Sequence, residues 1–320
     1  MDNLKGMLII LVVVGHMLEL VMDKGISKYL YEWIYTFHMP LFVFISGYFY
    51  HFNFKKLFCN LIYPYVIFQF LFCLFSRLIL GSSQAVNFTK PYWVMWYLMA
   101  MIIWSLAAIL FTKTGTIGKI IWIVLSSGAA LAIGWLDIIG REYALSRTIV
   151  FFPFFLWGNL YAGKEEKIIQ TGFLRYVLFI LAAAYSIILG FHYKDFLNKW
   201  FYETESYKAA GMTAGFRAGH LLLAVIFIVF FLVCMTDRQL PFLSKAGRNT
   251  MQIFLLHGFI VKLLGKYHIM KLIPYPKAAA FLIAVCLVWL LSADWLGRIL
   301  GPLMKGNFYE KKKSISDCIG

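Results

Sequence analysis

The chain begins with an apolar run that has ionisable residues at both ends, KGMLIILVVVGHMLE over residues 5–19. Lys5 and His16 are eleven residues apart. At 100° and 1.5 Å per residue they point from nearly the same face of a helix, about 16 Å apart along its axis. Glu19 lies one turn beyond His16. Because ionisable groups at membrane depth are costly, the pattern indicates a functional site on a membrane helix.

The composition is that of a membrane protein. Of the 320 residues, 62% are hydrophobic and only 14% are charged, whereas roughly 25% are charged in a soluble protein. Several apolar runs reach the roughly 20 residues that a helix needs to cross a bilayer. No segment between these runs is long enough to fold as a separate soluble domain. We therefore expect an all-α, polytopic bundle of transmembrane helices.

The apolar runs predict about ten spans. They form one integral membrane domain, residues 1–304, followed by a short basic tail, residues 305–320. An even number of spans places Lys311–Lys313 on the same side as Lys5, and basic residues favour the cytoplasmic side, so both termini are expected to be cytoplasmic. The expected spans are Leu4–Met22, Tyr29–Tyr50, Leu57–Leu80, Tyr92–Thr112, Ile117–Leu136, Ala144–Ala162, Phe173–Phe191, Gly215–Met235, Met251–Leu264 and Ala278–Leu300.

The charge and the cysteines exclude several other classes of site. The net charge of +15 comes from cations scattered over short loops, which suits contact with anionic lipid headgroups and not nucleic-acid binding. The five cysteines show no CxxC spacing, so neither a disulfide framework nor a metal site is expected. No small-residue cleavage site follows Leu18, so the first helix is expected to be a retained anchor rather than a signal peptide.

Further polar residues fall at a depth similar to that of the first-helix histidine. His38 lies about 13 Å below the outer end of the second span, and Pro40, which lacks a backbone N–H, should leave carbonyls free near it. Arg147 and Arg217 lie near the outer ends of the sixth and eighth spans, and His257 lies near the middle of the ninth. Several such groups at one depth predict a polar cavity that opens outward.

Most of these residues also have a structural interpretation. A histidine within the membrane, such as His220 or His257, often hydrogen-bonds to a neighbouring helix. The two arginines could extend their head groups to the lipid interface, and Lys5 could serve only as a topology anchor. His16 is harder to explain in this way, because it lies deep and next to Glu19.

The motifs resemble those of a known family. The run from Lys5 to His16 is similar to the first-helix signature of the acyltransferase type 3 family of integral membrane O-acyltransferases, in which ten residues separate a basic residue from an essential histidine. YTFHMPLFVFISGY, residues 35–48, resembles its second-helix motif. MWYL (95–98) and GRNTMQIFLLH (247–257) resemble later segments. Arg147 before FFPFF resembles the subgroup related to fucose 4-O-acetylases.

The resemblance implies transfer of an acyl group, usually acetyl from acetyl-CoA, to a hydroxyl of a surface glycan or its lipid-linked precursor, at the bacterial cytoplasmic membrane. A sugar hydroxyl needs a positioned base, and His16 is the best candidate because imidazole titrates near neutral pH. We expect Glu19 or His38 to orient His16. Lys5 is expected to bind the phosphates of acetyl-CoA at the inner face, and the pantetheine arm to reach His16 through a passage that connects both faces.

Three residues are assigned to the acceptor or to the developing oxyanion: Arg147, Arg217 and His257. The chain departs from some branches of the family in one respect: it has no Arg-x-x-Arg pair. Arg141 and Arg147 are six residues apart and cannot replace that pair by their spacing. Direct transfer and an acyl-histidine relay both remain open. Two other classes also remain open: a proton-coupled transporter of a small polar solute, which would use the same ionisable residues, and a structural subunit of an envelope assembly.

Overall fold

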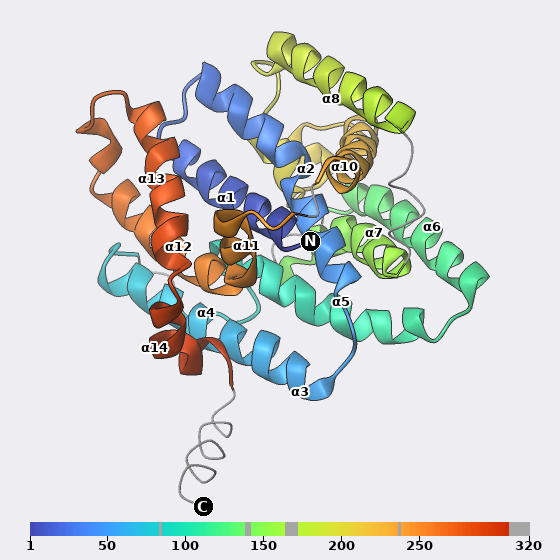
Figure 1. Cartoon of the computed structure of the whole chain (residues 1–320), viewed down its shortest axis with the longest axis horizontal. Coiled ribbons are helices and arrows are strands. Elements are labelled where there is room, and N and C mark those ends of the chain that lie inside the picture. Colours follow the sequence, from blue (N-terminus) through green and yellow to red (C-terminus); the bar gives the residue numbers. More distant parts are fainter. Residues whose placement is uncertain (83–84, 138–141, 164–171, 236–237, 307–320) are drawn as a thin grey trace, which may run out of the picture.

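The computed structural model describes residues 1–82, 85–137, 142–163, 172–235 and 238–306. Within these ranges the chain is all-helical and has no strand, which confirms the predicted all-α class. The predicted tail lysines Lys311–Lys313, and Arg141, lie outside the described residues. The helices are α1 (Asp2–Glu19), α2 (Ile26–Tyr48), α3 (Phe54–Leu57), α4 (Tyr63–Leu78), α5 (Trp96–Thr112), α6 (Thr116–Ala132), α7 (Leu145–Tyr161), α8 (Gly172–His192), α9 (Tyr207–Ala210), α10 (Ala214–Cys234), α11 (Pro241–Arg248), α12 (Thr250–Lys266), α13 (Pro276–Leu291) and α14 (Asp294–Met304) (Figure 1).

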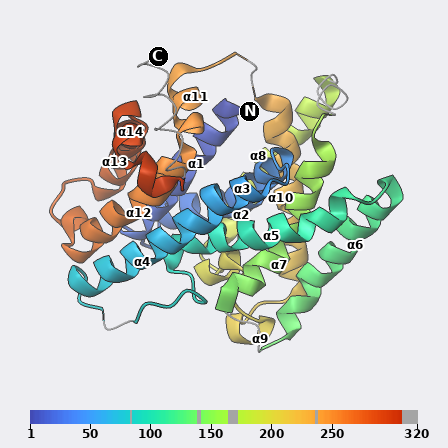
Figure 2. The same ribbon diagram turned by 90° about the horizontal axis from the view of Figure 1, so that it is seen from below.

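Helix α1 lies in the middle of the bundle. Leu8, Ile9, Val13 and Met17 are fully buried on it, because α2, α11, α12 and α13 all pack against it. A helix that is apolar around most of its circumference must be covered by lipid or by other helices, and in this bundle other helices cover α1. Figure 2 shows the N-terminus and α11 at one side of the bundle and α9 at the opposite side. The length of α1 thus separates two faces of the molecule.

Helices α2 and α7 approach each other through glycines. Gly47 of α2 lies against the backbone carbonyl of Phe155, and Gly158 of α7 lies against that of Phe44. A Cβ atom at either glycine would collide with the opposing carbonyl. Small residues of this kind allow membrane helices to pack with their backbones close together. The contact fixes α2 relative to α7, and these two helices carry His38 and Arg147.

The structure sorts the predicted spans into two groups. Each of the ten coincides with a helix or a run of helices. Among the described residues, five helices are long and apolar enough to cross a membrane, and six if the bent pair α13–α14 counts as one span. Helices α1, α2, α7 and α12 lie outside that set. The five are Phe54–Leu78, Trp93–Thr112, Thr116–Trp135, Gly172–His192 and Ala214–Cys234.

The tenth predicted span is not continuous. Helices α13 and α14 meet at an angle of 75°, between Leu291 and Asp294. The amide of Gln252 on α12 donates to the carbonyls of Leu291 and Ala293 at 2.5 and 3.1 Å, and Asn249 donates to that of Ser292 at 3.1 Å. These side chains donate to carbonyls at the break, where the helical hydrogen-bond pattern is interrupted.

Candidate active site

The last turn of α1 presents His16 and Glu19 to two tyrosines of α2. His16 Nδ1 lies 3.5 Å from Glu19 Oε1. The hydroxyls of Tyr31 and Tyr35 donate to the same carboxylate oxygen at 3.0 and 2.9 Å, and the Tyr35 hydroxyl lies 3.4 Å from His16 Nδ1. Because Nδ1 faces the carboxylate, Nε2 is the ring nitrogen left to accept a proton. A carboxylate that holds an imidazole in this way also orients it as a base.

His16 and Glu19 line a cavity of about 170 Å³, which we call the His16 cavity. His38 and Arg147 also line it. A second cavity, of about 260 Å³, includes Ser146 and Thr204, and we call it the vestibule. The two cavities share four lining residues and are therefore adjacent: Trp93, Trp96, Arg147 and Tyr202. Four of the residues predicted from the sequence thus meet at one cavity.

Trp93 forms one wall of this site in a strained conformation. It begins a short 3₁₀ turn, Trp93–Met95, with φ at 36°, in a region that a bulky residue rarely adopts. Its ring centroid lies 4.5 Å from that of His16, and Lys262 Nζ lies 4.2 Å from the centre of the indole. Such strain is typical of functional sites, where the surrounding structure holds a side chain in place.

Arg147 is part of the cavity wall. The chain enters α7 through Tyr143 and Ala144, both with positive φ, at 52° and 53°, and Arg147 follows in the first turn. Its Nε donates to the carbonyl of Tyr202 at 2.7 Å. The guanidinium lies 4.7 Å from the centre of the Trp96 ring and 5.7 Å from that of Tyr202. Arg147 is therefore enclosed by aromatic rings rather than extended toward lipid.

His38 and His257 share a hydrogen-bond pattern that differs from that of His16. The Nδ1 atom of each faces the carbonyl four residues earlier, that of Ile34 or Ile253, at 2.9 Å. His257 also stacks on His16, with ring centroids 5.5 Å apart. Of the two residues expected to orient His16, Glu19 contacts its Nδ1 atom, as does Tyr35, whereas no hydrogen bond links His38 to it among the residues that the structure describes.

Arg217 is not at the cavity, contrary to its predicted place beside the acceptor. It is fully buried, and its Nε lies 2.6 Å from Glu203 Oε2, an ion pair whose N–H is poorly aligned for a hydrogen bond. His220 Nδ1 lies 3.0 Å from the other oxygen of Glu203, and Nε2 lies 3.1 Å from the carbonyl of Thr36. Pro40 cannot donate to that carbonyl. Proline thus frees a carbonyl near His38, as predicted, and the imidazole of His220 contacts it.

A third cavity, the Lys5 cavity, lies at the other end of α1. Its volume is about 500 Å³, and Lys5, Lys56, Asn53 and Asn60 are among its lining residues. Lys5 pairs with Asp2, with Nζ 2.7 Å from Oδ1. The wall includes part of a π-helical turn, Phe58–Ile62, a distortion often found at functional sites. The cavity thus gathers cations and amides at the end of α1 opposite to His16.

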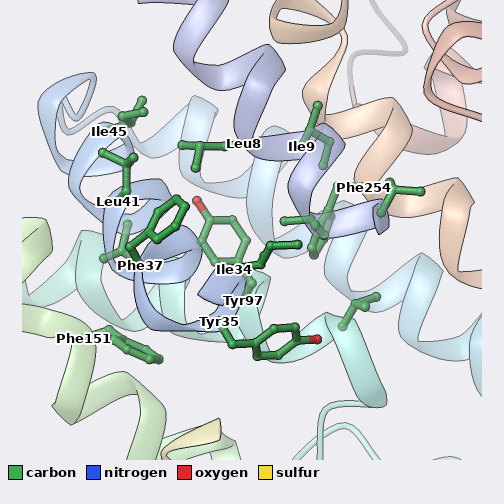
Figure 3. Packing of buried hydrophobic residues seen from close by; sticks show 14 of the residues in the cluster. Leu8, Ile9, Ile34, Tyr35, Phe37, Leu41, Ile45, Tyr97, Phe151 and Phe254 are labelled. Carbon is green, nitrogen blue, oxygen red and sulfur yellow. The ribbon is translucent and has the colours of Figure 1, made fainter. Parts of the chain in front are cut away.

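A packed layer lies between the His16 and Lys5 cavities, which share no lining residue. Leu8, Leu41, Tyr97 and Phe254 belong to this layer; all four are buried members of the core and are labelled in Figure 3. The Tyr97 ring centroid lies 5.6 Å from that of Phe254, and its hydroxyl hydrogen-bonds to Ser46, which lines the Lys5 cavity. Among the described residues these two cavities are therefore separate, and the passage between the two faces stays a prediction.

Comparison with known proteins adds the family. The family model described as "Acyltransferase domain" matches residues 1–294. The chain belongs to the acyltransferase 3 family. A curated relative, "Nodulation protein NolL" of Sinorhizobium fredii (strain NBRC 101917 / NGR234), is 29% identical over 192 residues, which are 53% of this chain and 50% of that protein. The chain therefore matches about half the length of that relative. No solved structure matches it.

The family match confirms the family predicted from the sequence. Several residues of the candidate site were not singled out from the sequence. Tyr31 and Tyr35 precede His38 by seven and three residues and so lie on its face of α2. That spacing could have identified them. Glu203 follows a polar segment without helical periodicity, so no comparable signal was present. Among the described residues, no group of three or more His, Cys, Asp or Glu side chains is placed to hold a metal ion.

Proposed function

We propose that this acyltransferase transfers an acetyl group from cytoplasmic acetyl-CoA to a hydroxyl of a cell-envelope glycan or its lipid-linked precursor, at the bacterial cytoplasmic membrane. One observation carries the proposal. A histidine backed by a carboxylate lines a cavity at one end of α1, and a cationic cavity lies at the other end. A base on one side and an anion site on the other suit a reaction whose two substrates come from opposite faces.

His16 is the proposed base. The acceptor hydroxyl donates its proton to His16 Nε2 as its oxygen attacks the thioester carbonyl, and Glu19 stabilises the imidazolium that forms. When the tetrahedral intermediate collapses, the carbon–sulfur bond breaks and His16 returns the proton to the leaving thiolate. The products are CoA and an acetyl ester, so the proton balance closes without another reactant. The hydroxyls of Tyr31 and Tyr35 keep Glu19 in place during this cycle.

Arg147 is the proposed electrostatic partner of the acceptor or of the oxyanion. It lines both the His16 cavity and the vestibule, so it lies where an incoming sugar would meet the base. Positive charge that is fixed before the reaction stabilises an oxyanion efficiently. Trp93 and Trp96 supply flat apolar surfaces on the same walls. His257 supports His16 from the side by stacking on it. We assign no contact with substrate to Arg217.

The Lys5 cavity is the proposed donor site. Lys5 and Lys56 place two ammonium groups on its wall, and the phosphates of acetyl-CoA need such cations. The pantetheine arm must pass the layer that contains Leu8 and Tyr97 to bring the thioester to His16. We therefore infer that donor binding parts this layer, and that α2, which contains Pro40 beside it, moves in that step.

The proposed topology is the one predicted from the sequence. All ten predicted spans cross the membrane, both termini are cytoplasmic, and residues 1–304 form one membrane domain with a basic tail at 305–320. Helices α7 and α12 have only 17 residues each, and α1 contains three charged residues; all three contribute residues to the proposed site and its surroundings. The partners in this scheme are the acyl-CoA donor, the glycan acceptor and membrane lipids.

The test is release of CoA from acetyl-CoA by the purified protein, measured with and without envelope glycan as acceptor. We expect acceptor-dependent release and an acetyl ester on the glycan, both absent in His16→Ala. Absence of acceptor-dependent release in the wild type would refute the proposal. Single cysteines at Lys56 and Thr204 test the topology. We expect impermeant thiol reagents to label them from opposite sides, and CoA to protect only the first.

A further inference from the structure

His38 presents an unused hydrogen-bond acceptor to the His16 cavity. A carbonyl oxygen can only accept, so the contact of Nδ1 with the Ile34 carbonyl at 2.9 Å makes Nδ1 the donor. In a neutral imidazole the other nitrogen, Nε2, then carries a lone pair and accepts. The ring is almost fully buried and lines the cavity. Within the described part of the chain, no donor to Nε2 is present.

His16 and His38 face the same small space. The Tyr35 hydroxyl lies 3.4 Å from His16 Nδ1, and the Tyr35 ring centroid lies 4.5 Å from that of His38. The two imidazoles therefore flank one tyrosine side chain. A sugar whose hydroxyl is placed against His16 comes within reach of His38 as well. Two acceptor nitrogens on the wall of one small cavity call for two donors on neighbouring positions of the substrate.

We propose that His38 accepts a hydrogen bond from a second hydroxyl of the acceptor, next to the one that is acylated. The substrate class is then a glycosyl unit with a vicinal diol, read by His16 and His38 together. This inference rests on the proposed function, because it assumes that a hydroxyl is activated at His16. It adds a determinant of specificity: a substrate without the second hydroxyl leaves His38 unpaired in a buried site.

The expected discrimination is large for so small a chemical change. Sites that hydrogen-bond a substrate hydroxyl reject analogues that lack it far more strongly than apolar pockets reject a missing methylene. For a single hydrogen bond to a neutral acceptor we expect a loss of about tenfold to hundredfold in kcat/KM. The loss in kcat/KM should come from the interaction between His38 and the second hydroxyl. Removing the hydroxyl should therefore have little further effect once His38 has been replaced.

The experiment is a cycle between enzyme variants and acceptors. Methyl galactopyranoside, methyl glucopyranoside and their monodeoxy derivatives are assayed as acceptors with acetyl-CoA, and the acetylated position is located by NMR. The variants are His38→Phe, which removes the acceptor nitrogen, and His38→Gln, whose side-chain oxygen can still accept. His257→Phe is the matched control, because His257 makes the same contact with its own helix but does not line the cavity.

We expect the wild type to lose at least tenfold in kcat/KM when the hydroxyl next to the acetylated position is removed. His38→Phe should show the same low kcat/KM with the complete and with the deoxy acceptor. His38→Gln should recover part of the difference in kcat/KM between the two acceptors. His257→Phe should keep the full wild-type ratio of the two kcat/KM values. Equal wild-type rates on both acceptors, or a ratio that survives in His38→Phe, would overturn the inference. No acceptor-dependent CoA release from any glycoside or from envelope glycan would instead refute the proposed function beneath it.

Discussion

Two histidine–glutamate pairs in this protein have similar contacts and opposite surroundings. In the His16–Glu19 pair the side chains are 13% and 28% exposed and line a cavity. In the His220–Glu203 pair they are 2% and 0% exposed, and Arg217 completes the cluster. The first pair can meet a substrate, whereas the second is sealed among helices. The same residue types thus line an open cavity in one place, where we propose a reaction, and form a buried ion pair in the other.

The buried cluster of Glu203, Arg217 and His220 is connected to the His16–Glu19 pair. Glu203 follows Tyr202, whose carbonyl accepts from Arg147 and whose hydroxyl lies 2.6 Å from that of Tyr31. Ser146, next to Arg147, donates to the Glu203 carbonyl at 2.6 Å. The buried ion pair therefore anchors the segment that forms one wall of the His16 cavity. A change there should act on folding first and on catalysis only through this wall.

The largest contrast is expected on removing the two imidazoles. His16→Ala should lower kcat by about 10²–10⁴-fold, the usual contribution of a general base, while the protein still purifies as a folded monodisperse species. His220→Ala should lower the yield and the thermal midpoint in detergent but leave residual folded enzyme active. Turnover of His16→Ala near the wild-type rate would remove the distinction between the pairs.

The next effect concerns stability. Glu203→Gln should leave Arg217 buried without its counter-charge, which typically destabilises a protein by about 3–5 kcal/mol. Replacing both residues, as in Glu203→Gln with Arg217→Met, should restore part of the loss, because no uncompensated charge remains. The measurement is thermal unfolding of the two variants side by side, with Glu19→Gln as the control at the open pair. A double variant no more stable than the single would contradict this account.

A smaller effect is expected at the donor cavity. Lys5→Ala should raise the KM for acetyl-CoA by about tenfold or less, since it removes one of several phosphate contacts, and should leave kcat nearly unchanged. Lys5→Arg should be tolerated if only charge matters. Steady-state kinetics, with acetyl-CoA varied at saturating acceptor, separate the effect on KM from the effect on kcat. A fall in kcat at constant KM would instead place Lys5 with the chemistry at His16.

The smallest effect extends the comparison to an exposed pair. Asp23, between α1 and α2, lies 2.5 Å from Lys277, with side chains 46% and 41% exposed. Hydrogen bonds from Lys277, Ser27 and the Gly25 N–H lower the pKa of Asp23 from 3.8 to about 2. A carboxyl whose pKa is lower in the folded state than in the unfolded state stabilises the fold at pH values above the unfolded-state pKa. This stabilisation is lost as the pH falls from about 4 to 2. Asp23→Asn should therefore cost less than about 1 kcal/mol near neutral pH and nothing near pH 2, as measured by thermal unfolding at both pH values.

The sequence predicts best what a single helix determines. Helical geometry places Lys5, His16 and Glu19 along α1, and the structure has them at two cavities and in one pair as that spacing requires. The all-α class follows equally from composition. These inferences need only the period and rise of a helix and the cost of polar groups in lipid.

Contacts between helices could not be predicted in the same way. Depth in the membrane assigned Arg217 to the cavity, but the face of α10 that carries it turns toward Glu203, in a segment without helical periodicity. His38 has the predicted depth, yet its Nδ1 is bound by its own helix. The break between α13 and α14 is bound by the side chains of Gln252 on α12 and of Asn249 just before it. Periodicity gives a residue's height and direction on its helix but does not identify the helix that faces it.

The packed layer between the two cavities has a consequence for the cell. An enzyme that is reached from both faces of an energised membrane would conduct protons along any continuous file of water through it. Leu8, Leu41 and Phe254 interrupt such a file with apolar groups, and the hydroxyl of Tyr97 is already bonded to Ser46. If the pantetheine arm itself fills the opening when the layer parts, the membrane stays electrically tight throughout turnover. An acyl group can then pass from a donor on one side of the membrane to an acceptor on the other without dissipating the ion gradient.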